Sequence, residues 1–177
     1  MRKTASRIVY ENRWMTVRED EIERADGSSG IYGVVEKADF ALVIPFDGAG
    51  FYLVEQHRYP VGARFHEFPQ GSWEAYPDAD PLALARGELK EETGLQADSM
   101  EHLGHLYEAY GFSTQGFDVY LATELSQGTP APTIEEENLR VEHVTVPDFE
   151  QLVRDGHIKD APSVAAYSLL QLREESV

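Results

Sequence analysis

Apolar runs in the first third of the chain predict β-strands. Turn-forming stretches separate these runs, of which "ADGSSG" (25–30) and "DGAG" (47–50) are the clearest. Residues 40–46 are nearly all apolar, which is typical of a strand covered on both faces. The strands predicted here lie at 14–23, 30–36, 40–46 and 51–59.

The rest of the chain combines strand and helix patterns without a regular repeat. Strands are predicted from alternating side chains, and helices from apolar spacing and end signals. These segments are strands at 116–125 and 139–146 and helices at 81–93, 147–155 and from residue 160. The order predicts a mixed α+β or α/β sandwich, with residues 1–38 as a strand-rich extension and residues 39–177 as the main domain.

Composition places the chain among ordinary globular proteins. Its 177 residues, 42% hydrophobic and 27% charged, suffice for one domain with a substantial core. No stretch approaches the ~18 apolar residues of a membrane span, and the first residues lack the apolar segment of a signal peptide. The lack of cysteine excludes disulfides and thiolate metal sites. We therefore expect a cytoplasmic protein with no membrane partner.

The net charge of −17 restricts the possible partners. The 15 lysines and arginines are scattered, so the protein would repel a phosphate backbone and we expect no nucleic-acid partner. A small anionic substrate would need metal ions or a few placed arginines to hold it. Most of the 32 acidic residues require no explanation beyond solubility.

The helix predicted at 81–93 has clear end signals. Asp80 is a good N-cap, Pro81 suits the first helical position, and Gly94 suits the position after the last turn. Its buried stripe is predicted from apolar residues at i, i+3 and i+7, namely Leu82, Ala85 and Leu89.

Three glutamates crowd the last turns of this helix. Glu88, Glu91 and Glu92 are spaced i, i+3, i+4, so they meet on one face and repel by roughly 0.2–0.5 kcal/mol per pair. They also lie at the negative end of the helix dipole, and Gly87 beside them costs about 1 kcal/mol relative to alanine. A hard cation such as Mg²⁺ would use these oxygens as ligands and offset the repulsion. The competing interpretation is a solvated acidic face.

The stretch around these glutamates resembles a family motif. "GELKEETGL" (87–95) is similar to the second half of the Nudix box, Arg-Glu-apolar-x-Glu-Glu-x-Gly-apolar. Three flanking segments resemble the ADP-ribose pyrophosphatase branch in order and spacing: "VEQHRYPVGARFHEFPQG" (54–71), "GFSTQGFDVYLATEL" (111–125) and "IKDAPSVAAYSLL" (158–170). The resemblance implies an α/β/α sandwich with a mixed central sheet. It also implies that the N-terminal strand unit helps to build a homodimer.

The resemblance assigns roles to particular residues. The three glutamates would ligate divalent metal ions, Mg²⁺ or Mn²⁺, together with the backbone carbonyl of Gln70. Arg58 and Glu67 match positions that contact the diphosphate and order the site. The implied reaction is metal-dependent hydrolysis of a nucleoside diphosphate linked to another group.

The helix and the loop before it depart from the Nudix pattern. The segment between Gly71 and Glu88 is two residues longer than in the standard box. The first box glutamate therefore has no clean equivalent, and the candidates to replace it are Glu74, Asp78 and Asp80. Gly87 occupies the box arginine position, with Arg86 one place earlier and about 100° round the helix. The role of that arginine is then either lost or supplied elsewhere.

Gln115 occupies the position of a loop glutamate in the branch. A glutamine cannot accept a proton from water, so a general base must come from elsewhere. The acidic stretch 135–137 is the obvious source, and we take Glu136 as the catalytic candidate. The alternative is that this stretch is a solvated loop.

Aromatic and histidine residues supply further candidates. The branch uses aromatics of its N-terminal unit for the nucleobase, and Trp14, Tyr32 and Tyr110 are available here. We take Trp14 as a substrate-binding residue, although such side chains more often lie in a core or a dimer interface. His102 and His105 are spaced i, i+3 where the sequence predicts the start of a further strand, which places them on opposite faces and argues against a histidine metal site.

The leading hypothesis is a Nudix-type pyrophosphohydrolase. It would cleave ADP-ribose or a related nucleoside diphosphate sugar into a nucleoside monophosphate and a sugar phosphate. The alternative is a Nudix-fold sensor that binds such a ligand without cleaving it, which Gly87 and Gln115 favour. The intact glutamate set favours the enzyme, since a pure binder has little reason to keep clustered carboxylates. An isomerase on the same fold is a third, less favoured hypothesis.

Overall fold

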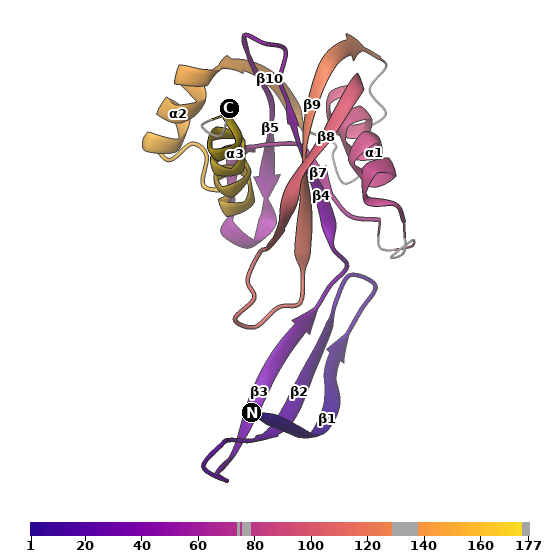
Figure 1. Cartoon of the computed structure of the whole chain (residues 1–177), viewed down its shortest axis with the longest axis vertical. Helices are drawn as coiled ribbons and strands as arrows, with labels where there is room; N and C mark the ends of the chain where they lie inside the picture. The colour runs from indigo at the N-terminus through magenta and orange to yellow at the C-terminus, as the bar shows by residue number, and fades with distance from the viewer. Residues whose placement is uncertain (74, 76–78, 129–137, 175–177) are drawn as a thin grey trace.

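The structure, a computed structural model, describes residues 1–73, 75, 79–128 and 138–174 (Figure 1). Its first strands form an antiparallel sheet that stands apart from the main body. They are β1 (Arg2–Glu11), β2 (Thr16–Glu23) and β3 (Ser29–Glu36), in the order β1-β2-β3. Thr16 pairs with Glu36, so the β1–β2 turn lies at the end of this sheet nearest the main body.

The main body is built on a mixed sheet in the order β7-β4-β9-β8. Its strands are β4 (Phe40–Pro45), β7 (Gln70–Gly71), β8 (Leu95–Tyr107) and β9 (Gly116–Gln127). β4 runs parallel to β9, whereas β7 and β8 are antiparallel to their neighbours. A second, antiparallel sheet has the order β10-β5-β6, with β5 (Gly50–Arg58), β6 (Ala63–Glu67) and β10 (Arg140–Thr145).

Helices cover both faces of the mixed sheet (Figure 1). α1 (Pro81–Thr93) lies on one side, and α2 (Val146–Arg154) and α3 (Ala161–Glu174) lie on the other. Alternate residues of β4 point to opposite faces of the sheet. Leu42 packs in the hydrophobic cluster that contains Phe149 of α2, and Val43 packs in the cluster that contains Leu89 of α1. This explains why all of β4 is buried, and it confirms the predicted α/β/α sandwich with an N-terminal strand-rich extension.

One strand was not predicted, and several strand boundaries differ from the predictions. The sequence predicts no strand in residues 2–11, yet β1 spans them. All ten of its side chains are exposed, so the alternation that marks a half-buried strand is missing, and β1 forms through its backbone pairing with β2. The strand predicted to begin near His102 starts at Leu95, and Tyr59, predicted to end the strand 51–59, instead begins the 3₁₀ turn Tyr59–Val61.

The prediction that His102 and His105 face opposite ways is wrong. A β-bulge between His102 and Gly104 adds one residue to β8 and reverses the expected alternation. Both rings therefore approach the Asp118 carboxylate, at 2.7 Å and 3.4 Å respectively.

The loop between β8 and β9 joins the N-terminal sheet to the main body. The backbone N–H of Val35 donates to the Phe112 carbonyl at 2.8 Å, and Thr114 donates back to the Val35 carbonyl at 2.9 Å. Gln115 is buried at this junction, where its Nε2 donates to the Ala38 carbonyl at 2.7 Å. Within the described residues, no helix has the length and apolar character to cross a membrane.

Candidate active site

The β5–β6 hairpin places three of the site's polar side chains on one face. η1 (Tyr59–Val61) turns the chain, and Gly62 ends it in the left-handed conformation that favours glycine, at φ 64°. In the resulting register Arg58 pairs with Ala63 and Val54 with Glu67. Since side chains alternate along a strand, Gln56, Arg58 and Glu67 project to the same side.

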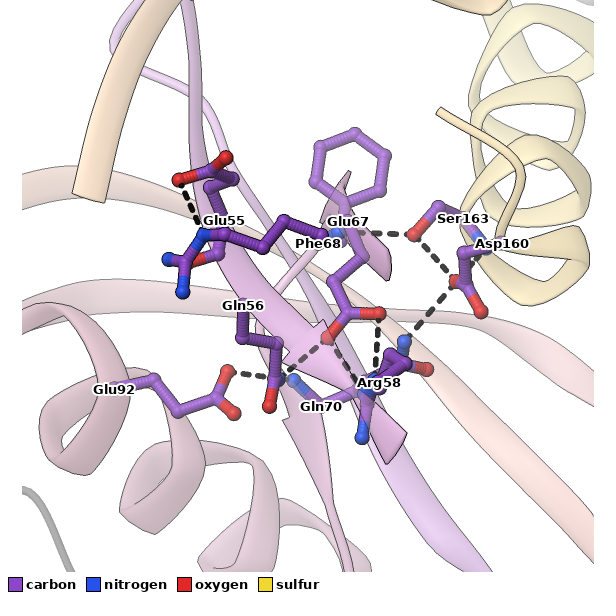
Figure 2. A network of polar contacts seen from close by, with 10 residues as sticks. Glu55, Gln56, Arg58, Glu67, Phe68, Gln70, Glu92, Asp160 and Ser163 are labelled. Carbon is purple, nitrogen blue, oxygen red and sulfur yellow. Dashed lines mark hydrogen bonds and ion pairs between the residues drawn. The ribbon is translucent and has the colours of Figure 1, made fainter. Parts of the chain in front are cut away.

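Arg58 and Glu67 form a two-point ion pair. Arg58 Nε and Nη2 donate to the two Glu67 oxygens at 3.1 Å and 2.6 Å, and Gln56 Nε2 donates to the carboxylate at 2.5 Å (Figure 2). The Glu67 side chain is only 2% exposed, and this burial raises its carboxyl pKa while Arg58 opposes the shift. Burial lowers the Arg58 pKa, but the charges of Glu67, Glu92 and Asp160 outweigh it and leave the pKa raised.

The acidic helix begins and ends as predicted. The Asp80 carboxylate accepts from the Ala83 backbone N–H at 3.2 Å, Pro81 opens the helix, and Gly94 closes it at φ 73°. The buried apolar face differs from the prediction in one position, because Leu84 is buried and Leu82 only partly so.

Two of the three glutamates of α1 are buried against strand β7. Glu88 and Glu92 are each 5% exposed, and Glu91 is half-buried. Glu92 Oε2 accepts from the Gln70 backbone N–H at 3.0 Å (Figure 2). A Cβ at Gly71 would lie 2.3 Å from Glu88 Oε2, so only glycine lets the Glu88 carboxylate approach this closely. The structure therefore brings Glu88, Glu92 and Gln70 together.

At Gly87, the position of the Nudix-box arginine, a neighbouring tryptophan ring takes the space that a side chain would need. A Cβ at Gly87 would lie 2.4 Å from Cζ2 of Trp73, so the indole occupies the space that a side chain at 87 would need. Arg86 does not replace the arginine at the site, because its Nη1 donates to the Ala97 carbonyl at 2.7 Å on β8.

Two residues of the α3 N-terminus belong to the site and were not predicted there. Asp160 Oδ2 accepts from Gln70 Nε2 at 3.0 Å, and the Ser163 hydroxyl accepts from the Phe68 backbone N–H at 2.9 Å (Figure 2). Both residues lie in the segment 158–170 that resembles the Nudix branch, and Asp160 was expected near a helix start. The capping pattern was visible in the sequence, but its contact with residues 68–70 was not.

The available ligand atoms fit a hard divalent cation. Carboxylate oxygens of α1 face the backbone of β7, and oxygen is the ligand that Mg²⁺ prefers. Within the described parts of the chain, no three or more histidine, aspartate or glutamate side chains already form a metal-binding group.

The remaining predicted site residues lie elsewhere. Trp14 is 43% exposed in the β1–β2 turn, where the Arg13 guanidinium lies 4.0 Å from its ring centroid. Glu136, and with it the acidic stretch 135–137, lies outside the described residues, as do Glu74 and Asp78.

Two family models together match most of the chain. Residues 36–167 match the NUDIX domain. The chain belongs to the Nudix family. Residues 1–35 match the nucleoside diphosphate sugar hydrolase N-terminal domain, so the two models meet at the end of β3. The division of this Nudix protein after residue 38 stays a prediction.

Several proteins are similar to this Nudix chain over most of their length. The ADP-ribose pyrophosphatase of Mycobacterium tuberculosis is 29% identical over 163 residues, 91% of this chain and 78% of that protein. The ADP-ribose pyrophosphatase of Bacillus subtilis is 27% identical over 172 residues, 96% and 92% of the two chains. The methanol dehydrogenase activator of Bacillus methanolicus is 27% identical over 168 residues, 94% and 90% of the two.

A solved structure shares the fold. The crystal structure of an ADP compounds hydrolase superposes with a TM-score of 0.86 at 19% identity, covering 99% of this chain and 94% of that one. Together with the family models, these similarities confirm the resemblance to the Nudix family and its ADP-ribose pyrophosphatase-like branch.

Proposed function

We propose that this Nudix pyrophosphohydrolase uses divalent metal ions, Mg²⁺ or Mn²⁺, to hydrolyse the diphosphate bond of ADP-ribose or a related nucleoside diphosphate sugar. The products are a nucleoside monophosphate and a sugar phosphate. One observation carries the proposal: the nearly buried carboxylates of Glu88 and Glu92 face the backbone of Gln70 and Gly71. The match of residues 1–35 to the nucleoside diphosphate sugar hydrolase N-terminal domain supports the substrate class.

The acidic face of α1 is the proposed metal site. Glu88, Glu91, Glu92 and the Gln70 carbonyl oxygen would hold the ions, which would supply polarisation of the diphosphate and activation of the attacking water. The cations would also offset the repulsion between a diphosphate and a protein of net charge −17.

Arg58 is the proposed diphosphate contact. Glu67 engages two of the five N–H donors of its guanidinium, and the Arg58 side chain stays 43% exposed. Among the described residues no hydrogen bond occupies the remaining donors, which would bind a phosphate oxygen while Glu67 fixes the orientation of the guanidinium plane. Arg58 would thus bind the substrate, and Glu67 would act through Arg58.

The hydrolysis needs a group that accepts a proton from the attacking water. The water oxygen bonds to one phosphorus, the bridging P–O bond breaks, and the bridging oxygen leaves with the other phosphate. Gln115 is unsuited to receive the proton, because its side chain is a neutral amide whose Nε2 already donates to the Ala38 carbonyl. We assign the proton acceptor to Glu136.

The N-terminal sheet is the proposed dimerisation element. The side chains of β1 are exposed at all ten positions, which leaves this strand available to a second copy of the chain. Trp14, at the end of the sheet nearest the main body, is the proposed nucleobase contact. Light scattering on the purified protein would give twice the monomer mass if the homodimer forms and the monomer mass if it does not.

A substrate panel tests the proposed reaction. The protein is incubated with nucleoside diphosphate sugars, dinucleotides and nucleoside triphosphates, with Mg²⁺ or with a chelator. We expect at least one nucleoside diphosphate sugar to yield a monophosphate and a sugar phosphate in Mg²⁺ only. Turnover in excess chelator would refute the metal dependence. Tight binding of the panel without turnover would establish the sensor in place of the enzyme.

A further inference from the structure

Residues 68–70, which lead from β6 into the first residue of β7, are held by hydrogen bonds from three directions. The Pro69 carbonyl accepts from the Val43 N–H of β4 at 2.9 Å. The Gln70 N–H donates to Glu92 of α1 at 3.0 Å, and the Phe68 N–H donates to Ser163 of α3 at 2.9 Å. The Pro69 carbonyl and the Gln70 N–H belong to the peptide group that precedes the Gln70 carbonyl, and β4 and α1 restrain it from two directions, while α3 restrains the peptide group at Phe68.

The contact from α3 depends on a pair of side chains. Asp160 Oδ2 accepts from the Ser163 backbone N–H at 2.8 Å and from the Ser163 hydroxyl at 2.7 Å. Because that hydroxyl proton points to Asp160, a Ser163 lone pair is left to accept from Phe68. Asp160 Oδ2 also accepts from Gln70 Nε2 at 3.0 Å, so the pair holds both ends of residues 68–70 (Figure 2).

Capping alone does not explain this arrangement. The bonds between Asp160 and Ser163 would satisfy the start of α3 without any contact to β6 or β7. The bonds to Phe68 and Gln70 instead connect α3 to the segment whose Gln70 backbone N–H bonds to Glu92 at the proposed metal site. Ser163 is fully buried, and a buried hydroxyl with two such partners has one orientation available.

From this geometry we propose that Asp160 and Ser163 are positioning residues for the metal site, fixing the backbone at Gln70 so that its carbonyl oxygen can ligate the cation. The inference rests on the proposed function. In this role both residues act through the backbone of residues 68–70 and need no contact with the substrate. Outer partners of metal ligands typically change metal affinity by about 10- to 100-fold when they are removed.

Loss of the Ser163 hydroxyl leaves the surrounding core in place. The Phe68 ring stacks on Phe149 with centroids 5.1 Å apart and meets Phe51 edge-on at 5.6 Å. These contacts do not involve Ser163, so Ser163→Ala removes the restraint on the peptide while the ring stays packed. We expect the variant to fold with the circular dichroism spectrum of the wild type.

The first test compares two serines of the same helix. Ser163→Ala removes the contact. Ser168→Ala is the matched control, because the exposed Ser168 hydroxyl donates to the Val164 carbonyl within α3 and, among the described residues, to no other element. Mn²⁺ is titrated into each full-length protein and the free ion is followed by its electron paramagnetic resonance signal. We expect about tenfold weaker Mn²⁺ binding for Ser163→Ala and wild-type binding for Ser168→Ala.

A second pair of variants separates hydrogen bonding from charge. Asp160→Asn keeps an oxygen acceptor for Ser163 and Gln70, whereas Asp160→Ala removes it. A positioning role predicts near-wild-type Mn²⁺ binding for Asp160→Asn and about tenfold weaker binding for Asp160→Ala. Equal losses in the two variants would show that Asp160 acts through its charge and would overturn the positioning role.

The outcomes distinguish this inference from the function on which it rests. Wild-type protein that binds no Mn²⁺ and hydrolyses no panel substrate refutes the metal-dependent function, and this inference falls with it. Wild-type protein that binds Mn²⁺ and turns over, with Ser163→Ala unchanged in Mn²⁺ affinity, refutes the inference alone. Weaker Mn²⁺ binding in Ser163→Ala, matched by a higher Mg²⁺ requirement for turnover, supports both.

Discussion

The N-terminal sheet and the candidate active site each contain an ion pair between arginine and glutamate, but the two pairs differ in how far they are exposed to water. On the sheet, Arg7 pairs with Glu19 at 2.8 Å, with the arginine side chain largely open to water. At the site, Arg58 pairs with Glu67 at 2.6 Å, and the carboxylate is nearly inaccessible. An exposed pair contributes ~0–1 kcal/mol to the free energy of unfolding. Breaking a buried pair costs about 3–5 kcal/mol, because the remaining partner is left as a buried charge without compensation. Burial, more than the contact itself, sets how much each pair matters.

The same contrast applies to the glutamates. Those of β2 are half-buried or exposed, so water and salt reach them and screen their repulsion. Those of α1 are held together on a buried face that local stability alone would disfavour. Such an arrangement is expected where a ligand, here the proposed cation, supplies the missing interaction.

The largest expected effect is on catalytic activity, and it comes from removing a carboxylate at the candidate active site but not from removing one on the N-terminal sheet. Glu92→Gln keeps an acceptor for the Gln70 N–H but loses the charge, so kcat/KM should fall by at least about 100-fold. The fold should persist, slightly stabilised by relief of i, i+4 repulsion. Glu19→Gln on β2 is the control and should retain activity. Steady-state kinetics and circular dichroism check both, and full activity in Glu92→Gln would refute the metal assignment.

The next largest effect concerns the two ion pairs. Arg58→Met leaves the buried Glu67 without its partner and should lower the free energy of unfolding by about 3 kcal/mol. Arg7→Met removes the partner of Glu19 on the exposed sheet and should cost less than about 1 kcal/mol. Urea denaturation measures both values. Similar losses in the two variants would show that burial does not separate the regions.

A smaller effect is expected from glycines. A Cβ at Gly87 meets the Trp73 ring, so Gly87→Ala should cost about 1–3 kcal/mol despite alanine's better helix propensity. At Gly33 on β3 a Cβ meets nothing within 4 Å, and Gly33→Ala should change stability by less than about 1 kcal/mol. Thermal unfolding compares the two. In a Trp73→Ala background the cost of Gly87→Ala should be smaller, and an unchanged cost would contradict the proposed clash.

The smallest expected effect is that of salt on the stability contributed by an exposed ion pair. The exposed Arg2 and Glu23 pair should contribute less than about 1 kcal/mol, and this contribution should vanish near 1 M salt, where the Debye length is about 3 Å. The difference in unfolding free energy between wild type and Glu23→Gln, measured at low and high salt, checks this. A difference that persists at high salt would place this pair with the buried one.

Elements with strong local signals were predictable. The bounds of α1 follow from Asp80, Pro81 and Gly94, and its acidic face follows from helical spacing. Strand β4 was predicted because a strand buried on both faces is apolar throughout. β1 was missed for the converse reason, since its side chains are all exposed and its pairing with β2 is made by the backbone.

The site was predictable only in part. The resemblance pointed to the α1 glutamates, Arg58 and Glu67, and the structure brings Glu88, Glu92, Gln70 and the arginine pair into one region. It did not point to Asp160 and Ser163, because Ser163 and Phe68 are 95 residues apart along the chain. It also could not foresee that a bulge in β8 would bring His102 and His105 to one face.

The sequence by itself determined the helix that carries the carboxylates, because capping and i, i+4 spacing act within a few residues. It also determined the net negative charge that any anionic substrate must overcome. Only the tertiary structure decided that Glu88 and Glu92 are buried against Gly71 and Gln70, and that α3 restrains the same backbone. Those contacts join segments distant in sequence, and packing of the whole sandwich sets their distances.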